Sequence, residues 1–348
     1  MGVSLQRASA MKGQPYDEAA RGPVVLDDVI ATDYHTAGEP FRIVTGGVPD
    51  VPGGSVRERR EAASRAEIDV IRRLLCHEPR GHADMYGCFL VAPDDEAADL
   101  GVLFWHKDGY STACGHGTIA LGAWAVQSGL VAAPDTGSCD VVIDVPSGRV
   151  TARVTVQRGA VTGVSFVNVP AYVTARDVDA GGVPVDVAYG GAFYAFVDAD
   201  RLGLPVAPAA TTELIAAGRR IKAALADSDA ARHPTDPRLS GIYGVVIHQR
   251  DGAAAERNVT VFADGAVDRS PCGSATSART ALLLARGTLA PGQPWTNTSI
   301  VGTRFAARSL QRTEDGWLTE VSGTAFRTGE HRFVLDPHDD VGAGFVLR

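Results

Sequence analysis

One short pattern occurs twice in this chain, and each copy begins with a cysteine. Cys114-Gly-His-Gly-Thr and Cys272-Gly-Ser-Ala-Thr are each followed by an apolar run of helical period. Aligned from the cysteine, both copies have Gly at +1, Thr at +4, Ala at +6 and +9, and Gly at +15. A glycine-bearing turn before such a run predicts a helix start, so each sulfur is expected at a helix N-terminus. The repeat indicates two similar halves, each organised around one helix.

The two predicted helices are apolar on nearly every face, as residues 119–126 and 282–284 show. A helix of this kind is normally buried, and the segments around both copies have the alternation of β-strands. We therefore expect an α+β fold with two pseudo-symmetric lobes, each a mixed sheet wrapped around a central helix. The active site is then expected in the cleft between the lobes, with one thiol from each side.

The chain divides on this basis into three parts. Residues 1–24 are charged and contain Gly and Pro but no apolar block of signal-peptide length, which predicts a flexible N-terminal extension. Residues 25–170 form the predicted N-terminal lobe, which carries Cys114 and which the strand-rich segment 325–348 would complete. Residues 171–324 form the predicted C-terminal lobe, which carries Cys272. Further helices are expected over 55–75 and 211–226.

Composition excludes several classes of protein. The chain has 33 Lys and Arg against 41 Asp and Glu, and a net charge of -8 argues against a nucleic-acid or anionic-membrane surface. No apolar run reaches the ~20 residues of a membrane span. Five cysteines without CxxC spacing argue against a disulfide framework or a zinc site and favour free thiols in a reducing cytoplasm. Rossmann and P-loop glycine patterns are absent from the sequence, and nothing resembles a pyridoxal-phosphate site, so no cofactor is expected.

Two opposed thiols can invert a stereocentre without a cofactor. One thiolate removes the α-proton from one face of the substrate, and the other thiol delivers a proton to the opposite face. The ordinary cysteine pKa of ~8.5 can be lowered at a helix N-terminus, so we expect reactive thiolates here. The helix N–H groups can also receive a substrate carboxylate and the charge that spreads onto it.

Simpler explanations exist for each of these residues. A single Cys-Gly before a helix is more often an inert buried thiol, but two matched copies make that explanation much weaker. His116 is either a structural cap or a substrate contact. Asp268 either anchors a turn or faces a substrate ammonium group as a buried carboxylate. The remaining cysteines have no such context and are interpreted as core or surface thiols: Cys76, Cys88 and Cys139.

From about residue 25 to its C-terminus the chain resembles the proline racemase superfamily. Four segments carry the resemblance: Asp33-Tyr-His-Thr-Ala-Gly-Glu-Pro-Phe-Arg-Ile-Val, Pro79-Arg-Gly-His-Ala-Asp-Met-Tyr-Gly, Cys114-Gly-His-Gly-Thr and Asp268-Arg-Ser-Pro-Cys-Gly-Ser-Ala-Thr-Ser-Ala-Arg. The fold of that family is shared with diaminopimelate epimerase and has two pseudo-symmetric lobes, each with a sheet around a central helix. The resemblance thus implies the architecture that the internal repeat predicts.

The resemblance also implies roles for particular residues. Cys114 and Cys272 match the acid/base pair of the family. The positions that match substrate contacts are Gly115, His116, Asp268, Gly273, Ser274, Tyr86 and Phe262. The family usually has Thr at the position of Ser274 and Gly at that of Ala275, so the second loop differs from the family pattern. The resemblance implies a small-molecule substrate as the partner. It is also the only basis for expecting a homodimer.

The family contains proline racemases, 4-hydroxyproline 2-epimerases and trans-3-hydroxy-L-proline dehydratases. The dehydratases typically have Thr in place of the second cysteine, so Cys272 favours a racemase or epimerase of proline or a hydroxyproline. Residues 100–111, 186–197 and 320–323 instead resemble the dehydratases. A two-base isomerase is therefore the leading interpretation, and trans-3-hydroxy-L-proline dehydratase is the alternative. A non-catalytic amino-acid binder would fit two intact cysteines least well.

Overall fold

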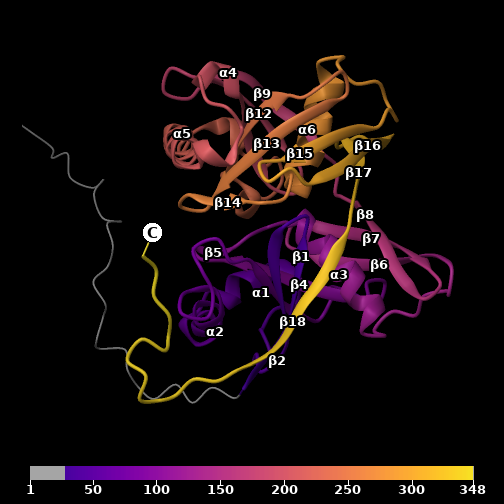
Figure 1. The fold of residues 1–348 in the computed structure, drawn as a ribbon, viewed down its shortest axis with the longest axis vertical. Helices are drawn as coiled ribbons and strands as arrows, with labels where there is room; N and C mark the ends of the chain where they lie inside the picture. The colour runs from indigo at the N-terminus through magenta and orange to yellow at the C-terminus, as the bar shows by residue number, and fades with distance from the viewer. Residues whose placement is uncertain (1–27, 348) are drawn as a thin grey trace, which may run out of the picture.

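Residues 28–347 are described by the structure, a computed structural model, and they form two lobes joined side by side (Figure 1). The extension predicted over residues 1–24 lies outside the described residues. The N-terminal lobe contains β1 (Val29–Thr36), β2 (Glu39–Gly46), α1 (Val56–Ala63), α2 (Ala66–Cys76), β3 (Gly87–Val91), β4 (Leu100–His106), β5 (Gly109–Tyr110), α3 (Gly115–Gln127), β6 (Gly137–Val145), β7 (Gly148–Gln157), β8 (Ala160–Val167) and β18 (Ala325–Phe333).

The C-terminal lobe contains the elements between β8 and β18. They are β9 (Tyr172–Asp179), β10 (Pro184–Tyr189), β11 (Phe193–Asp198), α4 (Ala199–Leu202), α5 (Thr211–Ala224), β12 (Ile242–Arg250), β13 (Ala255–Phe262), β14 (Ala266–Asp268), α6 (Gly273–Ala285), β15 (Trp295–Ser299), β16 (Arg304–Arg312) and β17 (Trp317–Gly323). We propose residues 170 and 324 as the lobe boundaries, because they fall between β8 and β9 and between β17 and β18.

Strand pairing follows the same order in both lobes. In the N-terminal lobe the strands pair as β18-β1-β2-β3-β4-β6-β7-β8, with β2–β3 and β4–β6 parallel and all other pairs antiparallel. In the C-terminal lobe they pair as β9-β10-β11-β12-β13-β15-β16-β17, with β11–β12 and β13–β15 parallel. The parallel pairs occupy equivalent places, so the predicted pseudo-symmetry is confirmed. The two sheets join where β8 pairs with β17.

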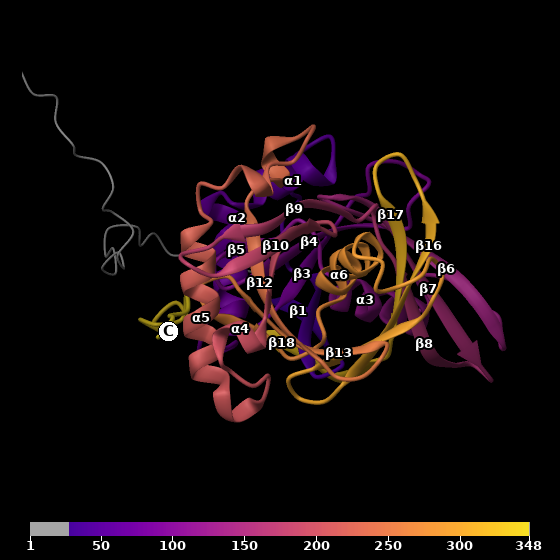
Figure 2. The ribbon, with the colours of Figure 1, turned by 90° about the horizontal axis from the view of Figure 1, so that it is seen from above.

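Each central helix is enclosed by the sheet of its own lobe. Helix α3 packs against β1, β7, β8 and β18, and α6 packs against the equivalent strands β10, β16, β17 and β9. Figure 2 shows α6 end-on inside the curved sheet of its lobe. This enclosure explains why neither helix sequence has a polar face, and it confirms the prediction of buried helices.

One predicted helix, over residues 55–75, is wrong in detail because the structure divides it into α1 and α2. Ser55 caps α1 by accepting a hydrogen bond from the Glu58 amide, and the helix ends at Ser64. Arg65 is extended, with φ -72° and ψ 148°, and α2 begins after it. Both helices have apolar faces toward the lobe, so the helical spacing of apolar residues continues from one helix to the next. This spacing therefore does not reveal the break between them.

Among the described residues, no helix is long and apolar enough to cross a membrane.

Candidate functional site

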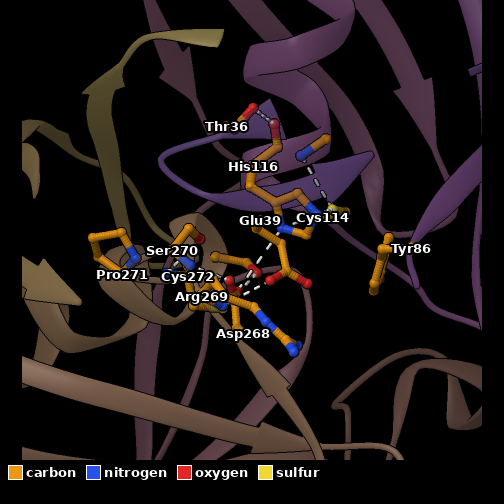
Figure 3. Close-up of polar contacts among 12 residues, drawn as sticks. Thr36, Glu39, Tyr86, Cys114, His116, Asp268, Arg269, Ser270, Pro271 and Cys272 are labelled. Atoms are coloured by element: carbon orange, nitrogen blue, oxygen red, sulfur yellow. Dashed lines mark hydrogen bonds and ion pairs between the residues drawn. The ribbon is translucent and has the colours of Figure 1, made fainter. Parts of the chain in front are cut away.

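The two cysteine-bearing turns meet where the lobes join. Cys114 is the N-cap of α3, and Cys272 is the N-cap of α6. The helix starts abut through Gly115 and Gly273, since a Cβ added to Gly115 would lie 2.5 Å from Cα of Gly273. Absence of a side chain at both positions allows this approach. The structure therefore brings the two halves of the sequence repeat together at one place (Figure 3).

A small cavity lies between the two cysteine turns. Its lining residues are Tyr86, Ala113, Cys114, Gly115, His116, Tyr194, Tyr243, Thr260, Phe262, Asp268, Cys272 and Ser274. The structure thus gathers every sequence-predicted site residue, with Gly273 packed directly against Gly115. The cavity volume of about 10 Å³ is room for about one water molecule. Both lobes supply the walls of this cavity.

The Cys114 thiol is held by the first turn of its own helix. Its Sγ accepts a hydrogen bond from the Gly117 amide at 3.2 Å and lies 3.5 Å from ring nitrogens of His116. Burial raises the pKa of Cys114 well above its ordinary value, the Gly117 amide lowers it, and the Asp268 carboxylate raises it further. The expected lowering of this pKa is therefore reversed, because desolvation outweighs the helix N-terminus.

Cys272 has an unusual backbone. Its φ of 61° lies in the left-handed region, which a residue with a side chain seldom adopts. The Cys272 amide donates to Ser270 Oγ at 3.0 Å, and its thiol donates to the Tyr194 hydroxyl at 3.8 Å. Burial and then Asp268 raise the pKa of Cys272, while the Ala275 amide lowers it. Burial thus favours the protonated form of both thiols.

Asp268 is buried between the two cysteine turns. One carboxylate oxygen accepts from the Ser270 amide at 2.8 Å, and the other lies 3.9 Å from Nδ1 of His116. Asp268 therefore both anchors its turn and faces the cavity, so its two interpretations are compatible. Burial lowers the pKa of His116, although Asp268 opposes this effect. The His116 carbonyl accepts from the Thr36 hydroxyl at 2.9 Å, which fixes this turn of α3.

Aromatic rings close one side of the cavity. The Tyr86 ring lies 4.9 Å from the His116 ring and 5.8 Å from the Phe262 ring, measured between centroids. Two further lining residues, Tyr194 and Tyr243, were missed by the sequence analysis. The hydroxyl of Tyr194 lies 2.7 Å from Ser274 Oγ, and that of Tyr243 lies 3.0 Å from the Tyr86 hydroxyl.

Glu39 is a third residue that the sequence analysis did not single out, although it lies in the first segment of the family resemblance. Its Oε2 accepts from the Arg269 amide at 2.7 Å, whereas its buried Oε1 has no partner among the described residues. Figure 3 shows its carboxyl group beside Asp268. Burial, followed by the charge of Asp268, raises the pKa of Glu39 well above its ordinary value. The Glu39 carboxyl group therefore supports the Asp268 turn from the opposite lobe.

Within residues 28–347, no group of three or more His, Cys, Asp or Glu side chains is arranged to hold a metal ion. The five cysteines are free thiols, and Cys76 and Cys88 are buried as expected for core thiols.

The comparison with known families decides the assignment. The family model described as proline racemase matches residues 31–346. The chain belongs to the proline racemase family. The resemblance predicted from the four segments is confirmed, and so is the prediction of an enzyme of this family.

Similar proteins within the family carry different names. A trans-3-hydroxy-L-proline dehydratase of Bacillus cereus is 42% identical, over 90% of this chain and 97% of its own. A 3-hydroxyproline 2-epimerase of Burkholderia multivorans is 44% identical, over 91% of this chain and 97% of its own. The crystal structure of a hydroxyproline epimerase from Agrobacterium vitis, with bound trans-4-hydroxy-L-proline, matches with a TM-score of 0.87 and 30% identity. It covers 92% of this chain and 95% of its own. The relatives thus include both isomerases and hydro-lyases.

Proposed function

We propose that this protein is a cofactor-independent racemase or epimerase that inverts Cα of proline or a hydroxyproline. The observation that carries the proposal is the opposed pair Cys114 and Cys272, each at the start of a central helix and both facing one cavity. Two such groups are what a two-base inversion requires.

The proposed reaction begins with the substrate held at both helix starts. The amides of Gly115 and His116 and those of Gly273 and Ser274 receive the carboxylate, and Asp268 faces the ring nitrogen. The Cys114 thiolate takes the proton from Cα, and the electron pair of the broken C–H bond spreads onto the carboxylate. The Cys272 thiol then donates its proton to the opposite face of Cα and becomes a thiolate.

The substrate itself helps to ionise the first thiol. Both cysteine pKa values are raised, chiefly by burial and with a contribution from Asp268. A cationic ring nitrogen beside Asp268 would offset that carboxylate and favour a nearby thiolate. Reactive thiolates are therefore proposed to form once the substrate is bound.

The alternative is dehydration of trans-3-hydroxy-L-proline. It is supported by the dehydratase-like segments 100–111, 186–197 and 320–323 and by the relative of that name at 42% identity. In that reaction Cys114 would take the α-proton, and the C3–O bond would break as the C2–C3 double bond forms. The departing hydroxide would leave as water with a proton from the protonated Cys114 or from solvent. No proton would return to Cα from Cys272.

One experiment separates the two reactions. The enzyme is incubated in D₂O with trans-3-hydroxy-L-proline, L-proline and trans-4-hydroxy-L-proline, and the products are followed by NMR. We expect deuterium at Cα together with the epimer of at least one substrate. A cyclic imine that reacts with o-aminobenzaldehyde, without any epimer, would instead establish the dehydratase. No reaction of any substrate would refute both.

Substitution of each cysteine gives an independent check. Cys272→Ser should abolish epimerisation, whereas a dehydratase would keep much of its activity; Cys114→Ser should damage both reactions. Cys139→Ser is the matched control, because Cys139 is partly exposed and lies outside the cavity.

We also propose a cytoplasmic location, since the free thiols suit a reducing compartment. The homodimer stays a prediction of the family resemblance.

A further inference from the structure

Three hydroxyl groups and one carbonyl oxygen form an unbroken row beside the cavity between the cysteine turns. Tyr243 Oη lies 3.0 Å from Tyr86 Oη, which lies 2.6 Å from Ser111 Oγ. Ser111 Oγ donates in turn to the Ala113 carbonyl oxygen at 3.0 Å. Tyr243 belongs to β12 in the C-terminal lobe, and the other three residues belong to the N-terminal lobe. The row therefore crosses the junction of the lobes, and Tyr86, Ala113 and Tyr243 line the cavity.

The direction of every hydrogen bond in this row follows from the number of hydrogens. Each of the three oxygen–oxygen contacts needs one hydrogen, and each of the three hydroxyls carries one. The Ala113 carbonyl has none, so the Ser111 hydrogen points to Ala113. The Tyr86 hydrogen then points to Ser111, and the Tyr243 hydrogen points to Tyr86. Any other arrangement leaves two oxygens within 3.0 Å of each other without a hydrogen between them.

This order decides what Tyr243 can offer to a bound molecule. Its one hydrogen is used on Tyr86, so its oxygen has a lone pair with which to accept but no hydrogen to donate. Burial raises the pKa of Tyr243 well above its ordinary value, although the bond to Tyr86 lowers it. The thiols Cys114 and Cys272 raise this pKa further. Tyr243 is therefore a neutral hydrogen-bond acceptor at the cavity.

The proposed pose of the substrate directs its ring carbons toward this acceptor. The helix starts receive the carboxylate and Asp268 faces the ring nitrogen, so the remaining ring atoms lie toward the aromatic side of the cavity. There the Tyr243 ring is stacked with the Phe262 ring, with centroids 5.8 Å apart and planes 16° apart. It meets the Tyr194 ring edge-on at 5.7 Å. An acceptor in such a wall distinguishes a ring with a hydroxyl from a ring without one, because an unmade buried hydrogen bond costs free energy.

We propose that Tyr243 is a specificity-determining residue that favours a hydroxyproline over proline. The ring hydroxyl of the substrate donates to Tyr243 Oη, whereas the ring carbons of proline carry no group that could donate. Ser111 is a positioning residue, because it does not line the cavity and acts by fixing the direction of the Tyr86 hydrogen. This inference rests on the proposed function, from which it takes the pose of the substrate.

The test measures binding to the full chain with Cys114→Ser and Cys272→Ser, which removes both proposed acid/base groups. Isothermal titration calorimetry gives the Kd of L-proline, trans-3-hydroxy-L-proline, trans-4-hydroxy-L-proline and 4-oxo-L-proline. We expect at least one hydroxyproline to bind on the order of tenfold more tightly than L-proline. The ring oxygen of 4-oxo-L-proline can only accept, so this compound should bind no more tightly than L-proline.

Three substitutions in that chain identify the group responsible. Tyr243→Phe keeps the ring and should remove most of the difference between the hydroxyproline and L-proline. Ser111→Ala allows the Tyr86 hydrogen to point to Tyr243, whose own hydrogen can then donate. The preference for a hydroxyproline should therefore fall, and 4-oxo-L-proline should bind more tightly than before. Tyr172→Phe is the matched control and should keep the preference, since Tyr172 lies outside the cavity.

Three results would each overturn this inference and leave the proposed function standing. Equal affinity for L-proline and both hydroxyprolines would show that the ring hydroxyl is not recognised. Equal weakening of L-proline and the hydroxyproline by Tyr243→Phe would show that Tyr243 contacts a group common to both, or only shapes the wall. Tighter binding of 4-oxo-L-proline than of both hydroxyprolines would reverse the direction of the hydrogen bonds. Failure of all four compounds to bind would overturn the inference and the proposed function together.

Discussion

The contact between Gly115 and Gly273 sets the distance between the two helix starts and therefore between the two thiols. This dependence can be tested by substitution. An added Cβ at Gly115 would lie 2.5 Å from Cα and 2.7 Å from the carbonyl carbon of Gly273, where ordinary contacts are 3.4–4 Å. Gly115→Ala must therefore move the two helix starts apart by about 1 Å. A displacement of about 1 Å at a reacting centre can reduce the rate on the order of 10²-fold.

We expect Gly115→Ala to lower kcat/KM for the inverted substrate by about 10²-fold. Overpacking of this kind costs about 1–3 kcal/mol, so the variant should stay folded with a moderately reduced Tm. The assay is the rate of inversion by polarimetry beside a thermal unfolding curve. Gly163→Ala is the control, because its Cβ would meet only the Gly323 carbonyl oxygen, at 3.9 Å.

The double variant makes the reasoning stricter. Once Gly115→Ala has separated the helix starts, Gly273→Ala adds a Cβ to a contact that is already open. Its additional loss should therefore be much smaller than its loss alone. A folded Gly115→Ala variant with unaltered kcat/KM would refute the idea that the glycine contact sets the spacing of the thiols.

Two predictions concern pH. Burial is the main reason that the pKa of Cys114 is raised well above its ordinary value. Because the reaction needs the thiolate, kcat/KM should rise about tenfold per pH unit from about pH 7 to about pH 9. A pH profile that reaches a plateau near neutrality would contradict this prediction. Burial raises the pKa of Glu39, so the folded chain binds the Glu39 proton more tightly than the unfolded chain does. Protonated Glu39 therefore stabilises the fold at low pH, and this stabilisation is lost as pH rises through the folded pKa. Glu39→Gln removes that dependence, so its Tm relative to the unaltered chain should increase from about pH 5 to about pH 9 in thermal unfolding; a constant difference would show that Glu39 is ionised in the fold.

The sequence was sufficient for features that depend on local chain order. The two Cys-Gly turns predict two helix starts, and the matched spacing predicts two equivalent lobes. Burial of both helices follows from their apolar faces. The structure agrees with these predictions because each depends on a pattern within about 16 consecutive residues.

The position of Tyr243 in the cavity could not be predicted from the sequence near it. In the pairing of β11 with β12, Phe193 opposes Ile242 and Tyr194 opposes Gly244, so Tyr243 is an extra, bulged residue. A bulge redirects the side chain, and here it lines the cavity beside the Tyr86 hydroxyl. Such a register shift depends on two strands far apart in the chain, so no nearby motif marks it.

The direction of the pKa shift at Cys114 was predicted wrongly, again because it depends on residues far apart in the sequence. A helix N-terminus can be recognised from the sequence, and it does lower the pKa of Cys114 through the Gly117 amide. The opposing effects are the depth of burial and the charge of Asp268, which comes from the other half of the chain. Their magnitude is a property of the assembled lobes, so it could not be read from either repeat alone.

The place of β18 has a consequence for synthesis of the chain on the ribosome. This strand occupies in the N-terminal lobe the position that β9 has in the C-terminal lobe, and it pairs with β1, the first strand described. It also covers α3. Translation therefore delivers the last piece of the first lobe only after the whole second lobe has left the exit tunnel. Until then α3 lacks one of its covering strands, and its apolar surface is open to chaperones and to other nascent chains.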